Sequence, residues 1–96
     1  MKVFVITPGM YTYGAMVIAG IVRDAGYEVT LTSTLEAAPE ETVFLSLYST
    51  QNLMDEGIRS FISEYRKTGG RVYVGGPVSA VPEMVLGELA PDAVIC

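Results

Sequence analysis

The segment Lys2-Val3-Phe4-Val5-Ile6, with the loop 7–14 and the apolar run Ala15 to Val22 behind it, decides how this chain folds. A strand that is apolar at nearly every position predicts burial on both faces, as in a parallel α/β sheet. The apolar run predicts a helix from about Gly14 that ends before Gly26, because glycine suits the left-handed residue that terminates a helix. Loop 7–14 would then lie at the carboxyl edge of the sheet, where open α/β sheets bind ligands.

This loop contains no His, Cys, Asp, Glu, Lys or Arg. Catalysis at such an edge usually needs a nucleophile, a base or a metal ligand, and none converges here. We therefore expect the loop to form a wall for a large, mostly neutral cofactor rather than to catalyse.

The remaining sequence continues the alternation of strands and helices. We expect strands over 27–32, 42–48, 71–74 and 92–96, and helices over about 53–68 and 82–90. The link 33–41 contains Pro39 and has room for one helical turn at most. Right-handed crossovers then predict a doubly wound, flavodoxin-like five-stranded parallel sheet of order 2-1-3-4-5, with its switch point between the first and third strands.

The second predicted helix has one apolar face and a polar start. Asn52 is expected to cap it, with Asp55 in its first turn. The apolar face consists of residues at helical spacing: Met54, Ile58, Phe61, Ile62 and Tyr65.

Composition excludes several classes of function. The 96 residues predict a single domain over 1–96, and six basic against eleven acidic residues argue against a nucleic-acid or anionic-membrane surface. The longest apolar run is too short to span a bilayer. With no His and one Cys, this chain alone provides no set of ligands for a zinc or haem site and cannot form an internal disulfide. We therefore expect the protein to be located in a reducing cytoplasm.

The first predicted helix, from Ala15 to Val22, is apolar around nearly its whole circumference. Such a helix is covered on more than one side, by a neighbouring helix, by a further domain, or by a second copy in a homo-oligomer. The last predicted strand, 92–96, leads to no ligand-facing turn. We therefore expect this chain to be a fragment of a longer protein.

Three motifs carry a resemblance to a known family. Gly14 precedes Gly26-Tyr27-Glu28-Val29 by twelve positions, Ser46-Leu47-Tyr48 ends the third predicted strand, and Gly75-Gly76-Pro77 follows the fourth. In these places the whole chain resembles the cobalamin-binding domain, especially the version that precedes radical S-adenosylmethionine enzymes. The family has histidine where this chain has Tyr11, aspartate where it has Gly9, and leucine where it has Tyr48.

The resemblance implies a cobalamin site formed by three loops. Its residues would be Thr7, Pro8, Gly9, Met10, Tyr11, Gly14, Ser46, Tyr48, Ser49, Thr50, Gly75, Gly76, Pro77 and Ser79. Without the family's histidine, the protein would give the cobalt no nitrogen ligand, as is common in domains that precede radical enzymes.

The resemblance also implies the rest of the protein. This chain would be the N-terminal part of a cobalamin-dependent radical S-adenosylmethionine enzyme, without the catalytic domain, and methyl transfer is the expected reaction. The S-adenosylmethionine and a 4Fe-4S cluster would belong to the C-terminal domain, whose linker would start near Cys96. The fragment alone would not be catalytic.

Other interpretations remain open. Each glycine of the three motifs could serve a ligand-free fold as a turn or cap residue. Thr7, Thr12 and Gly14 resemble a flavodoxin phosphate loop, which would indicate flavin or another nucleotide, although Pro8 and the residues 10–11 interrupt such a nest of donors.

A signalling receiver of the same topology is a third interpretation. It needs an acidic cluster at the ends of the first and third strands, where this chain has Thr7 and Tyr48. The sequence therefore disfavours it.

Overall fold

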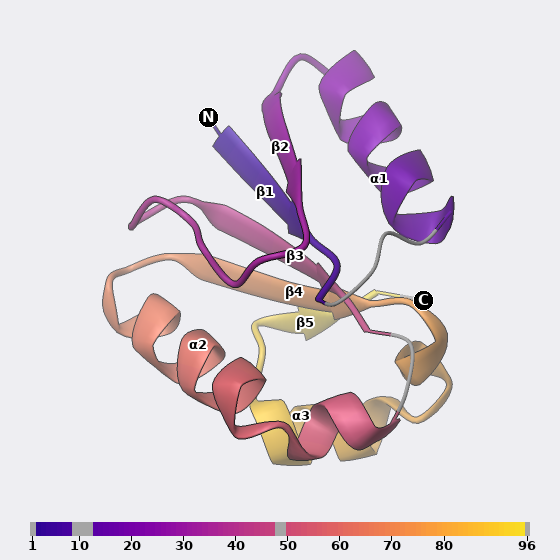
Figure 1. Cartoon of the computed structure of the whole chain (residues 1–96), viewed down its shortest axis with the longest axis vertical. Helices are drawn as coiled ribbons and strands as arrows, with labels where there is room; N and C mark the ends of the chain where they lie inside the picture. Colours follow the sequence, from indigo (N-terminus) through magenta and orange to yellow (C-terminus); the bar gives the residue numbers. More distant parts are fainter. Residues whose placement is uncertain (1, 9–12, 48–49, 96) are drawn as a thin grey trace.

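The sheet has five parallel strands in the order β2-β1-β3-β4-β5 (Figure 1). The computed structural model describes residues 2–8, 13–47 and 50–95. The strands are β1 (Lys2–Ile6), β2 (Glu28–Thr32), β3 (Thr42–Ser46), β4 (Arg71–Gly75) and β5 (Ala93–Val94). The helices are α1 (Tyr13–Asp24), α2 (Glu56–Lys67) and α3 (Pro82–Leu89), with 3₁₀ turns η1 (Thr50–Met54) and η2 (Pro77–Ala80). The predicted flavodoxin-like fold, with the first and third strands inside the sheet, is confirmed.

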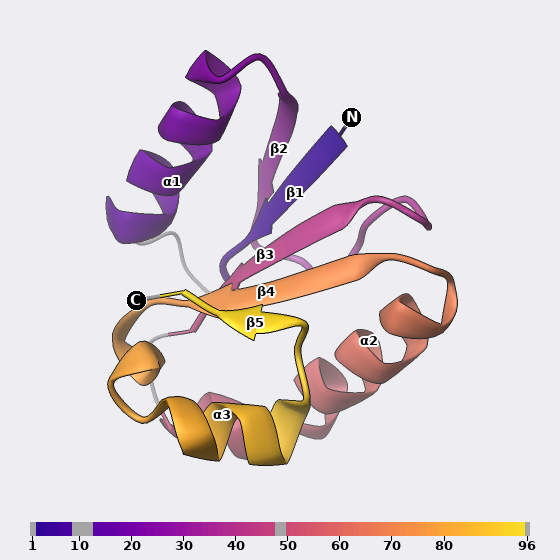
Figure 2. The ribbon, with the colours of Figure 1, turned by 180° about the vertical axis from the view of Figure 1, so that it is seen from behind.

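Helices cover the two faces of this sheet unequally. α2 and α3 lie on one face and α1 lies on the other, as Figure 1 and the reverse view in Figure 2 both show. The chain steps outward from β1 to β2 through α1, and in the opposite direction from β3 to β4 and β5 through α2 and α3. Right-handed crossovers in opposite directions place their helices on opposite faces.

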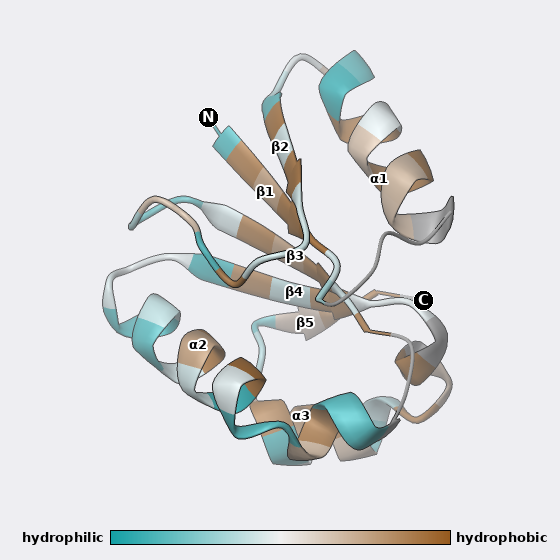
Figure 3. Cartoon of the chain, viewed as in Figure 1, coloured by the Kyte–Doolittle hydropathy of each residue, from teal (hydrophilic) through white to brown (hydrophobic). Residues whose placement is uncertain are grey.

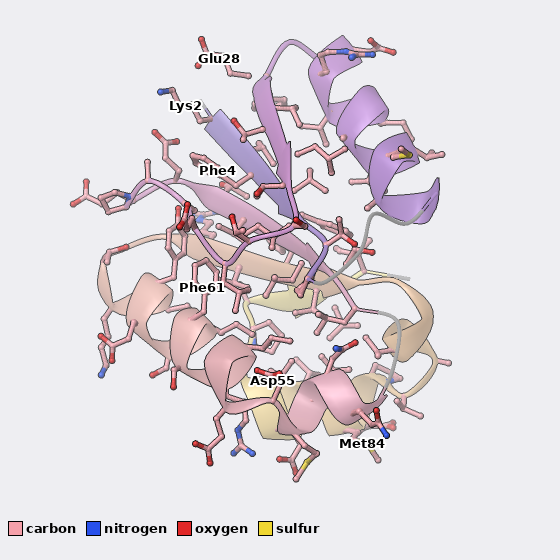
Figure 4. The ribbon with its side chains drawn as sticks, in the orientation of Figure 1. Lys2, Phe4, Glu28, Asp55, Phe61 and Met84 are labelled. Atoms are coloured by element: carbon pink, nitrogen blue, oxygen red, sulfur yellow. The ribbon has the colours of Figure 1, made fainter. Side chains whose placement is uncertain are left out.

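The main hydrophobic core fills the space between the sheet and the pair α2 and α3. Figure 4 shows Phe4 and Phe61 on this side, and both pack against the core. Its fully or nearly fully buried members include Val43, Leu45, Val72, Val74, Ile58, Ile62, Tyr65, Val85 and Leu89. The strand residues alternate, so every second side chain of β3 and β4 enters this core. We call this side the closed face.

A smaller core lies under α1. It consists of Val3 and Val5 from β1 and Ala15 and Ala19 from the helix. Short side chains at positions 15 and 19 let the helix approach the sheet closely. We call this side the open face, because α1 is accompanied there by no other helix of the described residues (Figure 2).

The link between β2 and β3 takes the place of a helix on the closed face. Leu35 and Ala37 pack against the main core. The Tyr65 hydroxyl donates to the carbonyl of Ala38 at 2.6 Å and accepts from the backbone N–H of Glu41 at 3.1 Å. One side chain of α2 thus fixes a crossover that contains no helical turn among its described residues, consistent with the short link predicted from its length.

The start of α2 differs from the prediction. Asp55, not Asn52, is the N-cap, and its carboxylate accepts from the N–H of Ile58 at 3.0 Å. Asn52 lies inside the 3₁₀ turn η1, which takes up the first residues predicted to be helical. For the same reason Met54 is 64% exposed rather than part of the buried stripe, whereas Ile58 is buried as predicted.

Two strands, β3 and β5, are also shorter than predicted. β5 consists of two residues, although the N–H groups of Asp92 and Ile95 extend its pairing by donating to Val72 and Val74. β3 ends at Ser46, before the predicted boundary. Within the described ranges, no helix has the length and apolar character needed to cross a membrane.

Candidate functional site

The carboxyl ends of β1, β3 and β4 meet at the switch point of the sheet (Figure 1). Ser46 pairs in register with Gly75, and the backbone N–H of Leu47 donates to the Gly75 carbonyl at 2.9 Å. Thr7 follows β1 directly; it is fully buried and its N–H donates to the carbonyl of Thr32. Ser46, the last residue of β3, is only 3% exposed. Two buried hydroxyl-bearing residues thus lie at this edge.

The predicted glycine pair follows directly on β4. A Cβ at Gly75 would lie 2.6 Å from the ring of Phe44, and a Cβ at Gly76 would lie 2.6 Å from the Leu47 carbonyl oxygen. Gly76 also has a φ of 94°, which side-chain-bearing residues rarely adopt. The fold itself therefore requires Gly76, whereas a Cβ at Gly75 would require the Phe44 ring to move. A bulky residue at position 76 would test folding before it tested binding.

The structure distributes the other predicted site residues over the three loops. Pro8 follows β1, Gly14 lies in the first turn of α1, Thr50 opens η1, and Pro77 and Ser79 lie in η2. The remaining predicted residues lie outside the described ranges: Gly9, Met10, Tyr11, Tyr48 and Ser49. Of the predicted set, the structure brings Ser46 and Gly75 into direct register, at the edge that Thr7 shares.

The chemistry of these loops is neutral. Residues 7–14, 46–52 and 75–81 contain no Asp, Glu, Lys, Arg or His. Within the described residues, no three His, Cys, Asp or Glu side chains gather as a metal site would need. Neutral loops of this kind suit a bulky ligand that hydrogen-bonds through amides and hydroxyls. They lack the cation that commonly pairs with a phosphate. In this respect the residues present fit a corrinoid cofactor.

Comparison with known proteins gives one informative match. A protein of Methanocaldococcus jannaschii whose provisional name is methylthiotransferase is 40% identical to this chain over 100 residues. The alignment covers 98% of this chain but only 22% of that protein. The chain is thus similar to one part of a much longer protein. No family model matches it.

A cavity that the sequence did not predict lies away from the switch point. A cavity of about 550 Å³ opens on the open face, with α1 on one side and β3 and β4 beneath it. It is lined by Val3, Ile18, Val22, Tyr27, Glu40, Glu41, Thr42, Phe44, Gly69, Arg71 and Tyr73. The only signal for it in the sequence was the helix 15–22, which is apolar on more sides than one sheet can cover.

Proposed function

We propose that this chain is a cobalamin-binding domain that holds its cofactor at the carboxyl edge of β1, β3 and β4. The observation that carries the proposal is the charge-free composition of the three loops at the switch point of a 2-1-3-4-5 sheet, where Thr7 and Ser46 are both buried. Open α/β sheets bind ligands at this point. A neutral lining favours a large ligand that carries many amides over a phosphate-rich one.

We further propose that the domain serves a catalytic domain of the radical S-adenosylmethionine class in the same polypeptide, for methyl transfer. The matched relative supports an attached catalytic domain, because its name describes a group-transferring enzyme and most of its length lies outside the match. That name refers to a methylthio group, so methyl transfer rests on the resemblance to cobalamin-binding domains alone. Iron–sulfur clusters are held mainly by cysteine thiolates. Since this chain has one cysteine, the ligands of any cluster would have to come largely from the rest of such a protein.

The chain's own residues would bind and orient the cofactor without ligating its metal. Bound cobalamin would supply a cobalt centre that can carry a methyl group. The chain has no histidine, and the residue at the family's histidine position is Tyr11, which offers a phenol oxygen in place of a ring nitrogen. A hard oxygen donor is a poor ligand for a soft metal, so this chain would give the cobalt no nitrogen ligand.

An absorbance titration with hydroxocobalamin tests this function, using two variants of the same strand. Ser46 and Thr42 both belong to β3 and point to the same side of the sheet, at its carboxyl and amino edges respectively. Loss of one hydrogen bond predicts that Ser46→Ala weakens cobalamin binding by about three- to tenfold. Thr42→Ala should bind as the parent does, and equal weakening by both variants would argue against a site at the carboxyl edge.

Titration with flavin mononucleotide in the same assay tests the main alternative, a flavin site. A flavodoxin-type phosphate site needs hydroxyls and backbone N–H donors packed at a helix start, and Pro8 and residues 10–11 interrupt such a nest, so we expect no saturable binding. Saturable flavin binding together with a failure to bind cobalamin would replace the proposed function by a flavin site.

A further inference from the structure

The open face contains a groove beside α1. The cavity of about 550 Å³ has a floor formed by β3 and β4 and one wall formed by α1. On the closed face, the space over the same strands is filled by α2 and α3 (Figures 1 and 2). No second helix of the described residues lies on the open face, so they form no opposite wall.

The floor of this groove carries a positive charge at one end and aromatic rings further along. Arg71 and Tyr73 lie on the same side of β4 and line the cavity. Phe44 of β3 is paired in register with Tyr73 and also lines it. Arg71 is exposed and forms no ion pair with another of the described residues. From the amino edge to the carboxyl edge of the sheet, the floor is thus first cationic and then aromatic.

The outer side of α1 has the matching pattern in the opposite order. Val17, Ile21 and Asp24 form one row at the spacing i, i+4, i+7. Val17 is 41% exposed, Ile21 is 60% exposed, and the Asp24 side chain is 81% exposed. Figure 3 shows apolar colour along much of this helix, whereas α2 is polar on its outer side. Because α1 joins two parallel strands, it runs from the carboxyl edge to the amino edge, and its row is first apolar and then anionic.

We propose that two copies of this chain associate through their open faces, with α1 of each copy lying in the groove of the other. The two-fold axis would run parallel to the strands, between the two α1 helices. Each α1 would then be enclosed between β1 and β2 of its own copy and β3 and β4 of the second copy. Each groove receives one helix and each copy supplies one, as an interface with two-fold symmetry requires.

The charges favour this alignment of the two copies. With the strands of both copies parallel, Asp24 at the end of α1 reaches the amino edge of the other groove, where Arg71 of the second copy lies. The negative end of the helix dipole faces the same guanidinium. Glu40 and Glu41 also line this end, and Arg23, next to Asp24, supplies a cation for them.

The opposite alignment lacks this complementarity. It would place the end of α1 at the carboxyl edge of the second copy, beside loops 7–14, 46–52 and 75–81. These loops contain no charged residue, so Asp24 would have no cation there. The aromatic floor would then face the polar end of the row instead of its apolar residues.

The size of the contact predicts a weak, reversible dimer. It extends along one helix of 12 residues, which is about 18 Å long. Interfaces of the small class are transient, so we expect a dissociation constant in the micromolar range. The chain should be dimeric at about 100 µM and monomeric below about 1 µM. Unfolding measured at the lower concentration therefore reports on single copies.

Sedimentation velocity across this range of concentration tests the association, using two matched variants. Ile21→Glu places a carboxylate in the apolar row. Met84→Glu makes the same kind of change on α3, where Met84 is 50% exposed and points away from the sheet (Figure 4). We expect Ile21→Glu to remain monomeric at about 100 µM and Met84→Glu to dimerise like the parent. A parent chain that is monomeric throughout, or equal dimerisation of the two variants, would overturn the proposal.

Exchange of the two charges tests the alignment. In a dimer of Asp24→Lys, or in a dimer of Arg71→Glu, like charges meet twice, and we expect association about three- to tenfold weaker than that of the parent. A mixed dimer of the two variants contains one original pair and one reversed pair, and both attract. An equimolar mixture should therefore recover the affinity of the parent.

A mixture that associates no better than the separate variants would contradict the pairing of positions 24 and 71 and overturn the proposed arrangement. Both positions are exposed, so the exchanges should leave the fold intact, and urea unfolding at about 1 µM checks this. The result for Ile21→Glu does not depend on them. None of these measurements involves cobalamin, so the outcome is independent of the proposed function.

Discussion

The two faces of this sheet carry the same strands but have very different cores. On the closed face, α2, α3 and the β2–β3 link surround thirteen buried residues. On the open face, α1 covers four, and an apolar groove remains beside it. The comparison shows that the described residues cover one face of the sheet densely and the other only in part.

The sequences of the helices already contain this difference. α2 is strictly amphipathic and buries Ile58, Ile62 and Tyr65 against one partner. α1 is apolar on the side that faces the sheet and on a second side, at Val17 and Ile21, which faces no described residue closely enough to be buried. The two helices thus differ in how many of their sides are apolar, and the described residues cover only one of the two apolar sides of α1.

The largest expected difference between the faces comes from two neighbouring residues of β3. Leu45 is fully buried in the closed face, and Phe44 points to the open face and is only partly buried. In the 96-residue chain, Leu45→Ala should lower the free energy of unfolding by about 2–5 kcal/mol because it leaves a cavity in a sealed core. Phe44→Ala should cost clearly less, about 1–2 kcal/mol, since water already reaches part of the ring.

Urea denaturation of both variants measures this contrast. Equal losses would show that the open face is as well packed as the closed face, and would contradict the comparison.

Replacement of two different glycines by alanine is expected to change the free energy of unfolding in opposite directions. Gly76→Ala forces a side chain into a φ of 94° and toward the Leu47 carbonyl, so we expect a loss of about 2–3 kcal/mol. Gly20→Ala in α1 meets no atom within 4 Å, and should instead stabilise the chain by about 0.5–1 kcal/mol through helix propensity. Thermal unfolding of both variants checks the signs. Destabilisation by Gly20→Ala would mean that the side of α1 at Gly20 is already in contact with another surface.

The smallest expected effect belongs to the Tyr65 hydroxyl, which fastens the β2–β3 link to the closed face. Tyr65→Phe removes its hydrogen bonds to Ala38 and Glu41 and should cost about 1–2 kcal/mol near neutral pH. Burial raises the pKa of Tyr65 above its ordinary value of 10.0. The neutral phenol therefore contributes stability that is fully present below pH 10 and is lost as the pH rises through the folded-state pKa.

The free energies of unfolding of the parent and of Tyr65→Phe are compared from neutral pH to pH values above 10. Their difference isolates the contribution of the hydroxyl. The difference between the two proteins should shrink above pH 10. A difference that stays constant or grows with pH would show that burial does not raise this pKa.

Much of the fold could be predicted from the sequence because the signals are local and strong. Apolar strands such as 2–6, the glycine at position 26 and the proline that opens α3 each indicate an element or its end, and handedness then orders the strands. The start of α2 could not be predicted in the same way, because Asn52 and Asp55 are both good N-caps. The choice between them depends on the 3₁₀ turn η1, which packs Leu53 into the core.

Two features of the candidate site could be read from the sequence. The strand order predicted which loops meet at the switch point, and the neutral character of these loops follows from residues 7–14, 46–52 and 75–81. That Phe44 fills the space above Gly75, and that the Leu47 carbonyl lies against Gly76, depends on contacts between strands that are far apart in the chain. Sequence spacing contains no information on such contacts, so a glycine required by the fold and a glycine required by a ligand look alike in it.

We propose that the carboxyl edge holds cobalamin without a protein nitrogen on the cobalt. Electron paramagnetic resonance of the Co(II) form tests this, on the protein translated from the complete reading frame and on its Tyr11→His variant, both labelled with nitrogen-15 histidine. We predict that the parent protein shows no nitrogen-15 doublet and that Tyr11→His shows one. A nitrogen-15 doublet in the parent protein would contradict the proposal.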